Sequence, residues 1–176
     1  MFSRNTAVLA LALCLAWAPA AHAQSMTSIG IAAGATIPTG DFGNQTQTGY
    51  HGMVTLDVHP PLAPIGMRLD GMFNELDYKA GLTASGKAHI WAATANIVLN
   101  PSGFVGPYAI GGLGVYHQVF PTTGLAQAHT NDHAGVNAGI GFRFGLTGFY
   151  AFAEARYHKV LDQPTQFVPI SFGLVF

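Results

Sequence analysis

Apolar and polar side chains alternate along most of this chain, in segments of roughly ten residues separated by clusters of Gly, Pro, Asn and Asp. An alternation with a period of two is typical of β-strands whose two faces meet different surroundings. Beyond the N-terminal segment, no stretch approaches the roughly 20 consecutive apolar residues of a membrane-spanning helix. The pattern therefore predicts an all-β chain with eight strands, near residues 28–37, 50–59, 66–76, 88–99, 106–119, 134–145, 149–158 and 167–176.

The connections between these strands have two lengths. Three are short and turn-like, at residues 59–64, 100–103 and 146–148, and four are longer and more polar, at residues 39–49, 77–87, 121–133 and 160–166. Short and long connections alternate strictly, and an even number of strands lets the sheet close with both ends on one side. This arrangement is typical of an outer-membrane barrel with tight periplasmic turns and long external loops.

Alternation alone does not decide which face meets lipid, because a soluble lipocalin-like barrel also alternates, with its apolar face inward. Such a barrel needs Lys and Glu along its outer face, and no lysine falls within the predicted strands. In residues 134–145 the polar face holds mainly glycine and other small residues, which suits a crowded interior. We therefore expect an eight-stranded antiparallel up-and-down transmembrane β-barrel with apolar faces in lipid, where closure satisfies every backbone amide and carbonyl.

Aromatic residues support this orientation, since they fall near the predicted strand ends, where interfacial girdles lie. Strands also attract aromatic residues for other reasons, so the support is partial. The residues are Tyr50, Phe73, Trp91, Phe104, Phe120, Phe144, Phe149, Tyr157 and Phe176.

The N-terminal segment has the three parts of a secretory signal peptide. Arg4 provides the positive charge, residues 7–17 form the apolar centre, and Ala21-His22-Ala23 fits a small-x-small cleavage site. A transmembrane anchor is the alternative, but the apolar run is shorter than a span requires. We predict a cleavable signal peptide at residues 1–23 and a barrel domain at residues 24–176.

Cys14 is the only cysteine. It follows Leu13, whereas a lipoprotein box has a small residue before its cysteine, so lipidation is the less favoured alternative. After cleavage the chain contains no cysteine, which excludes disulfides and thiolate chemistry.

Composition narrows the classes of protein further. Charged residues make up 9% of the 176 residues, against roughly 25% in ordinary soluble domains. The 49% hydrophobic content excludes a disordered chain. A net charge of -1 argues against nucleic acid as a partner.

Several motifs resemble one family. The closing segment, residues 167–176, ends in Phe with apolar residues at alternate positions before it, and residues 37–43, 106–114 and 153–157 carry further similarity. Residues 26–176 together resemble the small OmpA/OmpX-like outer membrane protein beta-barrel domain family. The resemblance implies a Gram-negative outer-membrane location, and a C-terminal signal for the barrel-assembly machinery at Phe172, Leu174 and Phe176. It implies no single activity.

Alternate positions of each predicted strand face inward, and the polar residues of the interior lie at these positions. Three acids and three arginines are among them, and because side chains roughly fill an eight-stranded barrel, we expect these charges to be paired. The predicted lumen network is Asp57, Arg68, Asp70, Asn96, Arg143, Glu154 and Arg156, accompanied by Thr55 and Asn74. We interpret it as an electroneutral plug, with a gate or narrow proton or ion path as the alternative.

Histidines gather toward the long-loop end, at His51, His89, His117, His129, His133 and His158. Imidazole suits Zn, Cu or Ni, but no pair has the spacing of a known metal motif. We expect exposed rim histidines, no metal site and no cofactor. Lysines also lie by the long loops, where they can meet lipopolysaccharide phosphates; acids at the same end make the rim mixed in charge.

No catalytic site is predicted. The combination of His158, Ser171 and Glu154 does not have the spacing of a triad, and geometry decides such cases. We therefore predict a non-enzymatic outer-membrane barrel, monomeric, with a plugged lumen, whose long loops serve envelope structure or surface interaction. Its expected partners are outer-membrane lipids, lipopolysaccharide and the barrel-assembly machinery. A lipid A-modifying enzyme or a narrow solute or ion conduit is the alternative.

Overall fold

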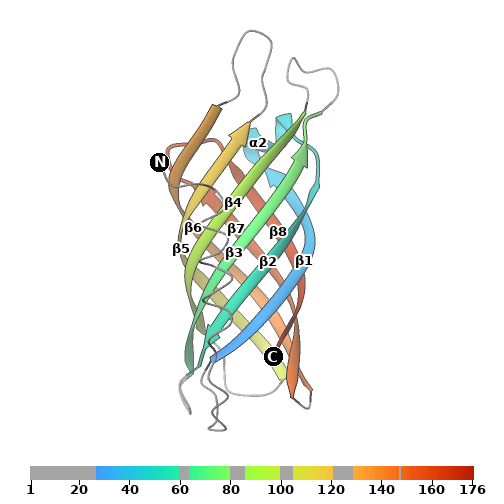
Figure 1. The fold of residues 1–176 in the computed structure, drawn as a ribbon, viewed down its shortest axis with the longest axis vertical. Coiled ribbons are helices and arrows are strands. Elements are labelled where there is room, and N and C mark those ends of the chain that lie inside the picture. The colour runs from blue at the N-terminus through green and yellow to red at the C-terminus, as the bar shows by residue number, and fades with distance from the viewer. Residues whose placement is uncertain (1–26, 60–63, 80–85, 100–104, 121–128, 147) are drawn as a thin grey trace, which may run out of the picture.

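The strands of this protein form one closed antiparallel barrel in the computed structural model, which describes residues 27–59, 64–79, 86–99, 105–120, 129–146 and 148–176 (Figure 1). Each strand pairs with its neighbour in sequence, and the first pairs with the eighth to close the sheet. This confirms the predicted eight-stranded up-and-down barrel. The predicted signal peptide and parts of the connections lie outside the described residues.

The strands are β1 (Thr27–Thr39), β2 (Gly49–Val58), β3 (Ile65–Asp77), β4 (Lys87–Leu99), β5 (Val105–Phe120), β6 (His129–Leu146), β7 (Phe149–Val160) and β8 (Gln166–Val175). Their bounds follow the prediction except in β6, which begins at His129 instead of near residue 134. The reason is that β5 and β6 continue to pair as far as Phe120 and His129. A short helix, α2 (Gly40–Gln45), was not predicted.

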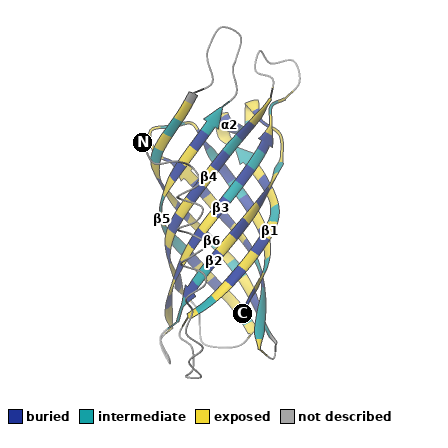
Figure 2. Ribbon diagram, viewed as in Figure 1, coloured by how far each residue is buried: buried dark blue, intermediate teal, exposed yellow. Residues whose placement is uncertain are grey.

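The two faces of each strand differ as the sequence predicts, so that buried and exposed residues alternate along the ribbon (Figure 2). On β8, Ile170, Phe172 and Leu174 are exposed, while Ser171 between them is buried. Within the described residues there is no helix with the length and apolarity to span a bilayer. Large apolar side chains cover the outer surface, among them Ile31, Val54, Leu69, Ile97, Leu113, Val115 and Ile140.

Aromatic residues do not all lie where the sequence suggested. Phe73 and Trp91 lie together on the outer surface near the long-loop end, with ring centroids 4.5 Å apart. Phe120, in contrast, packs against the buried interior cluster because its position on β5 has inward parity. Phe104 lies outside the described residues.

Inward glycines make room for side chains that reach across a strand. Gly141 on β6 is paired with Tyr108 on one side and Glu154 on the other. A Cβ at Gly141 would lie 2.2 Å from the Tyr108 ring. The ring therefore crosses β6 over the glycine, and its hydroxyl donates to Glu154 Oε2 at 2.8 Å. The glycines set the interior contacts across neighbouring strands.

Candidate functional site

Four charged side chains form a closed ring across the middle of the barrel. Arg68 on β3 contacts Asp70 (Nε to Oδ1, 3.0 Å) and reaches Glu154 on β7 (Nη2 to Oε2, 2.7 Å). Arg156 on β7 donates to Asp70 (Nη1 to Oδ2, 2.7 Å) and to Glu154 (Nε to Oε1, 2.9 Å). Arg68 and Arg156 thus each contact both carboxylates. The four side chains are at most 3% exposed, so the ring is a buried, electroneutral unit.

The two strands supply the ring by the same local rule. Side chains two residues apart on a strand share a face, so each of β3 and β7 presents one acid and one arginine inward. Asn96 on β4 supports the acid of β3, since its Nδ2 donates to Asp70 Oδ2 at 2.9 Å. Such hydrogen bonds offset part of the cost of removing charges from water.

Asp57 and Arg143 lie near the short-turn end and depart from the predicted pairing. Tyr150 on β7 lies between the two charges. Its hydroxyl donates to Asp57 Oδ2 at 2.9 Å, and its ring lies 4.3 Å below the Arg143 guanidinium carbon. Within the described part of the chain, neither charge has an ion-pair partner within 4 Å. The expectation that all six interior charges pair directly is therefore wrong: a hydrogen bond and a cation–π contact replace the missing pair.

A chain of neutral hydrogen bonds lies in the interior nearer the long loops. The Thr36 hydroxyl donates to Asn74 Oδ1 (2.8 Å), so its oxygen accepts from the Nδ1–H of His51 (3.1 Å). His51 Nε2 is then free to accept from the Ser171 hydroxyl (2.8 Å). Asn74 ends the chain by donating to the Ile90 carbonyl (3.2 Å). The chain places a proton on His51 Nδ1 and links β8, β1, β2, β3 and β4.

The expectation of exposed rim histidines is wrong for His51 and His158, which are 2% and 1% exposed. His158 shares a hydrogen bond with the Tyr116 hydroxyl at 2.8 Å and stacks on Phe167. Each histidine lies an even number of residues from a buried acid on the same strand, so its side chain also points inward. The alternation of inward and outward positions along the strands therefore predicts that both histidines are buried. The expectation that they are exposed was based on their nearness to the long loops.

On the outer surface near the long loops, two further histidines are paired with acids. His117 lies 2.6 Å from Asp132, and His89 lies 3.3 Å from Glu75. Glu75 also pairs with Lys87, which begins β4, and Lys159 lies within β7, so the expectation of lysine-free strands is wrong at their upper ends. Across the described ranges, no group of three or more His, Cys, Asp or Glu side chains is placed to hold a metal ion.

Apolar side chains pack together in the interior at the long-loop end. Phe42 of α2 is 5% exposed and belongs to the buried cluster that includes Leu76, with Tyr78 packed against it. Backbone hydrogen bonds tie the two segments, from Gln47 N to Asp77 O and from Lys79 N to Gln45 O. Burial raises the pKa of the Tyr78 hydroxyl, which keeps it neutral. Buried apolar side chains of α2 and β3 thus lie in the interior at the long-loop end.

Ser171 bonds to His51, and the structure does not bring it to His158. Its residue is 2% exposed and faces the barrel interior, so a lipid at the outer surface does not reach the hydroxyl. The hydrogen bonds of His51 end on Thr36 and Asn74 without a carboxylate. The arrangement suits a structural connection between strands better than a nucleophile.

Comparisons with known proteins agree with this architecture. The family model "Outer membrane protein beta-barrel domain" matches residues 6–176. Among solved structures, Ail, the attachment invasion locus protein of Yersinia pestis, has 17% identity and a TM-score of 0.57, covering 85% of this chain and 97% of Ail. The structure of Ail in complex with the heparin analogue sucrose octasulfate has 18% identity and a TM-score of 0.52, covering 85% of this chain and 96% of that one.

The N-terminal β-barrel domain of Pseudomonas aeruginosa OprF has 14% identity and a TM-score of 0.51, covering 85% of this chain and 97% of that one. At these identities the likeness shows the fold alone. No curated protein matches the sequence.

Proposed function

The chain belongs to the outer membrane protein beta-barrel domain family, located in the outer membrane of Gram-negative bacteria, and we propose that it is a non-enzymatic barrel with a plugged lumen that serves envelope structure and surface interaction. Two parts of the molecule support different parts of this proposal. The interior supports the plug, and the long-loop end supports the interaction role.

The ring of Arg68, Asp70, Glu154 and Arg156 is the observation that carries the plug. It joins β3 to β7 across the bore, and each carboxylate contacts both arginines. An ion that crossed the barrel would have to separate these contacts in a buried setting, where an arginine or acid left alone is strongly unfavourable. Phe42 and its neighbours add an apolar barrier above the ring.

The long-loop end supports contact with lipid headgroups over capture of a polyanion. The solved complex of Ail holds a sulfated heparin analogue. In the described part of this chain, however, Lys87 is paired with Glu75, and Lys79 donates to the Gly43 carbonyl. Lys159 is exposed on the outer surface of β7, where its ammonium can meet a lipopolysaccharide phosphate as a point charge.

The outward residues of the last strand support the assembly role proposed for them. Phe172 and Phe176 are 65% and 63% exposed, and Leu174 is 39% exposed on the same outer face. Such side chains are accessible to the barrel-assembly machinery before they meet lipid. Replacing Phe176 by Ser would then lower the yield of folded barrel in the outer membrane, with the monomeric state unchanged.

Recording in planar bilayers tests the plug. Purified wild-type protein should give no large, reproducible, salt-dependent current, and a variant with Glu154→Ala should give current steps if the ring is the barrier. Large steps from the wild type would overturn the plug. Mass spectrometry of lipid A from cells with and without the protein tests the absence of enzyme activity, because a mass change that requires the protein would contradict it.

A further inference from the structure

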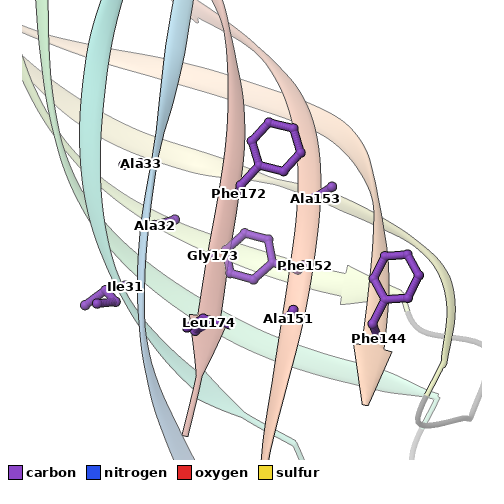
Figure 3. A pocket seen from close by; sticks show the side chains of 10 residues that line it. All are labelled: Ile31, Ala32, Ala33, Phe144, Ala151, Phe152, Ala153, Phe172, Gly173 and Leu174. Atoms are coloured by element: carbon purple, nitrogen blue, oxygen red, sulfur yellow. The ribbon is translucent and has the colours of Figure 1, made fainter. Parts of the chain in front are cut away.

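A hollow of about 580 Å³ lies on the outer surface of the barrel, over β6, β7, β8 and β1 (Figure 3). Its sides include four large apolar side chains: Ile31, Phe144, Phe172 and Leu174. All four are well exposed, from 39% for Leu174 to 65% for Phe172. They project from the surface instead of packing into the interior.

The floor of this groove comes from small outward residues placed beside the large ones by the strand register. Ala151 on β7 is paired with Phe144 on β6 and with Leu174 on β8. On the adjacent rung, Phe172 on β8 has Ala153 on one side and Ala33 on the other. Methyl groups next to protruding rings leave a depression, and Figure 3 shows the side chains of Phe172 and Ala153 on neighbouring strands.

We propose that this groove holds a single hydrocarbon chain of a membrane lipid from the periplasmic leaflet. The groove is part of the apolar outer face, which meets the bilayer in an outer-membrane barrel, so hydrocarbon is the medium in contact with it. None of the residues that line it has a polar side chain that could recognise a headgroup.

Its height on the barrel identifies the leaflet. Phe149 begins β7 at the short-turn end and lies 6.0 Å, ring to ring, from Phe176. Ala151 and Leu174 are each two residues from these aromatic side chains, or about 7 Å along a strand. The groove is therefore in the half of the bilayer next to the short turns, which face the periplasm in this family.

The size of the groove fits a lipid hydrocarbon chain better than a second copy of the protein. A standard protein interface uses roughly 20–30 residues on each side, whereas ten residues line the groove. A cavity of roughly 150 Å³ already accommodates benzene, and this groove is about four times larger. It can therefore hold a run of methylene groups.

The expected effect is order, not high affinity. Lipid tails are as apolar as the groove, so hydrophobic transfer gives no gain over bulk lipid. Close contact with the rings gives many small dispersion terms that a flat surface does not offer. The lipid chain in the groove should exchange with bulk lipid more slowly, and be better ordered, than the neighbouring lipid chains.

Methyl NMR on the processed protein tests this in nanodiscs of phosphatidylethanolamine and phosphatidylglycerol. With ¹³C-methyl alanine, Ala33, Ala151 and Ala153 should show severalfold stronger NOEs to lipid methylenes than Ala93, an exposed outward alanine on β4. Ala153→Phe fills the groove and should reduce the lipid NOEs of Ala33 and Ala151 to the level of Ala93. The matched change Ala93→Phe should leave it intact.

Both variants must show the heat-dependent gel shift of a folded barrel; if Ala153→Phe does not, the comparison of alanines within the wild type still decides the question. Equal NOEs at groove and control alanines would overturn the proposal. So would efficient disulfide dimerisation of an Ala33→Cys variant, because a second copy would then occupy the groove. Neither result depends on whether the lumen conducts.

Discussion

His51 on β2 and Ser171 on β8 share a hydrogen bond of 2.8 Å although β1 runs between their strands. The bond exists because Gly34, the β1 residue on the same rung, has no side chain: a Cβ there would lie 3.0 Å from His51 Cε1 and 1.8 Å from the Ile170 carbonyl oxygen. The strands at the closure of the barrel are thus connected twice, by the backbone ladder and by this crossing contact.

Gly34→Ala should destabilise the barrel by about 1–3 kcal/mol, as overpacking of a tight interior does. The added methyl displaces His51 and strains the pairing of β1 with β8. Urea unfolding in detergent or lipid measures the change. Gly52→Ala is the matched control, because a Cβ there meets nothing within 4 Å. Equal effects at the two positions would show that the crossing contact does not depend on Gly34.

Glu154→Ala should destabilise far more, by about 3–5 kcal/mol, because it leaves Arg68 and Arg156 sharing a single carboxylate in a buried site. The double change Glu154→Leu with Arg68→Met restores neutrality and should recover part of the loss. Unfolding free energies of Glu154→Leu, Arg68→Met and the double variant give the coupling, expected at about 0.5–3 kcal/mol. Strictly additive losses would contradict a closed ring.

Tyr150→Phe should cost about 1–3 kcal/mol, since Asp57 loses the donor to its Oδ2 while Arg143 keeps the ring beneath it. The control is Tyr157→Phe, whose hydroxyl donates to Gln166 on the exposed surface and whose loss should be smaller. Urea midpoints at constant slope compare the two. A larger loss from the surface variant would contradict the role given to Tyr150.

Trp91 should lie at the membrane interface on the long-loop side, where tryptophan is enriched. Once residues 1–23 are removed it is the only tryptophan, because the other is Trp17. Its fluorescence should be quenched most by phospholipids brominated near the headgroup end of the chain. Strongest quenching by lipids brominated near the chain terminus would place it at the bilayer centre instead.

The sequence predicts most of the barrel because a period of two assigns each side chain to a face. That rule places Arg68 and Glu154 inside without knowledge of any contact. It does not give height or position around the barrel, so it could not show that Tyr150 lies between Asp57 and Arg143. The six-residue helix α2 is too short for a helical period, and the role of Phe42 becomes visible only once the fold brings it to the buried cluster.

The interior charges are divided unevenly along the chain. β1 to β4 carry Asp57, Arg68 and Asp70, two acids and one arginine, whereas β5 to β8 carry Arg143, Glu154 and Arg156, two arginines and one acid. Each half of the barrel would take an uncompensated charge of opposite sign into the membrane, and only their union is neutral. The interior is therefore electrically neutral only when the strands of both halves are paired in one barrel.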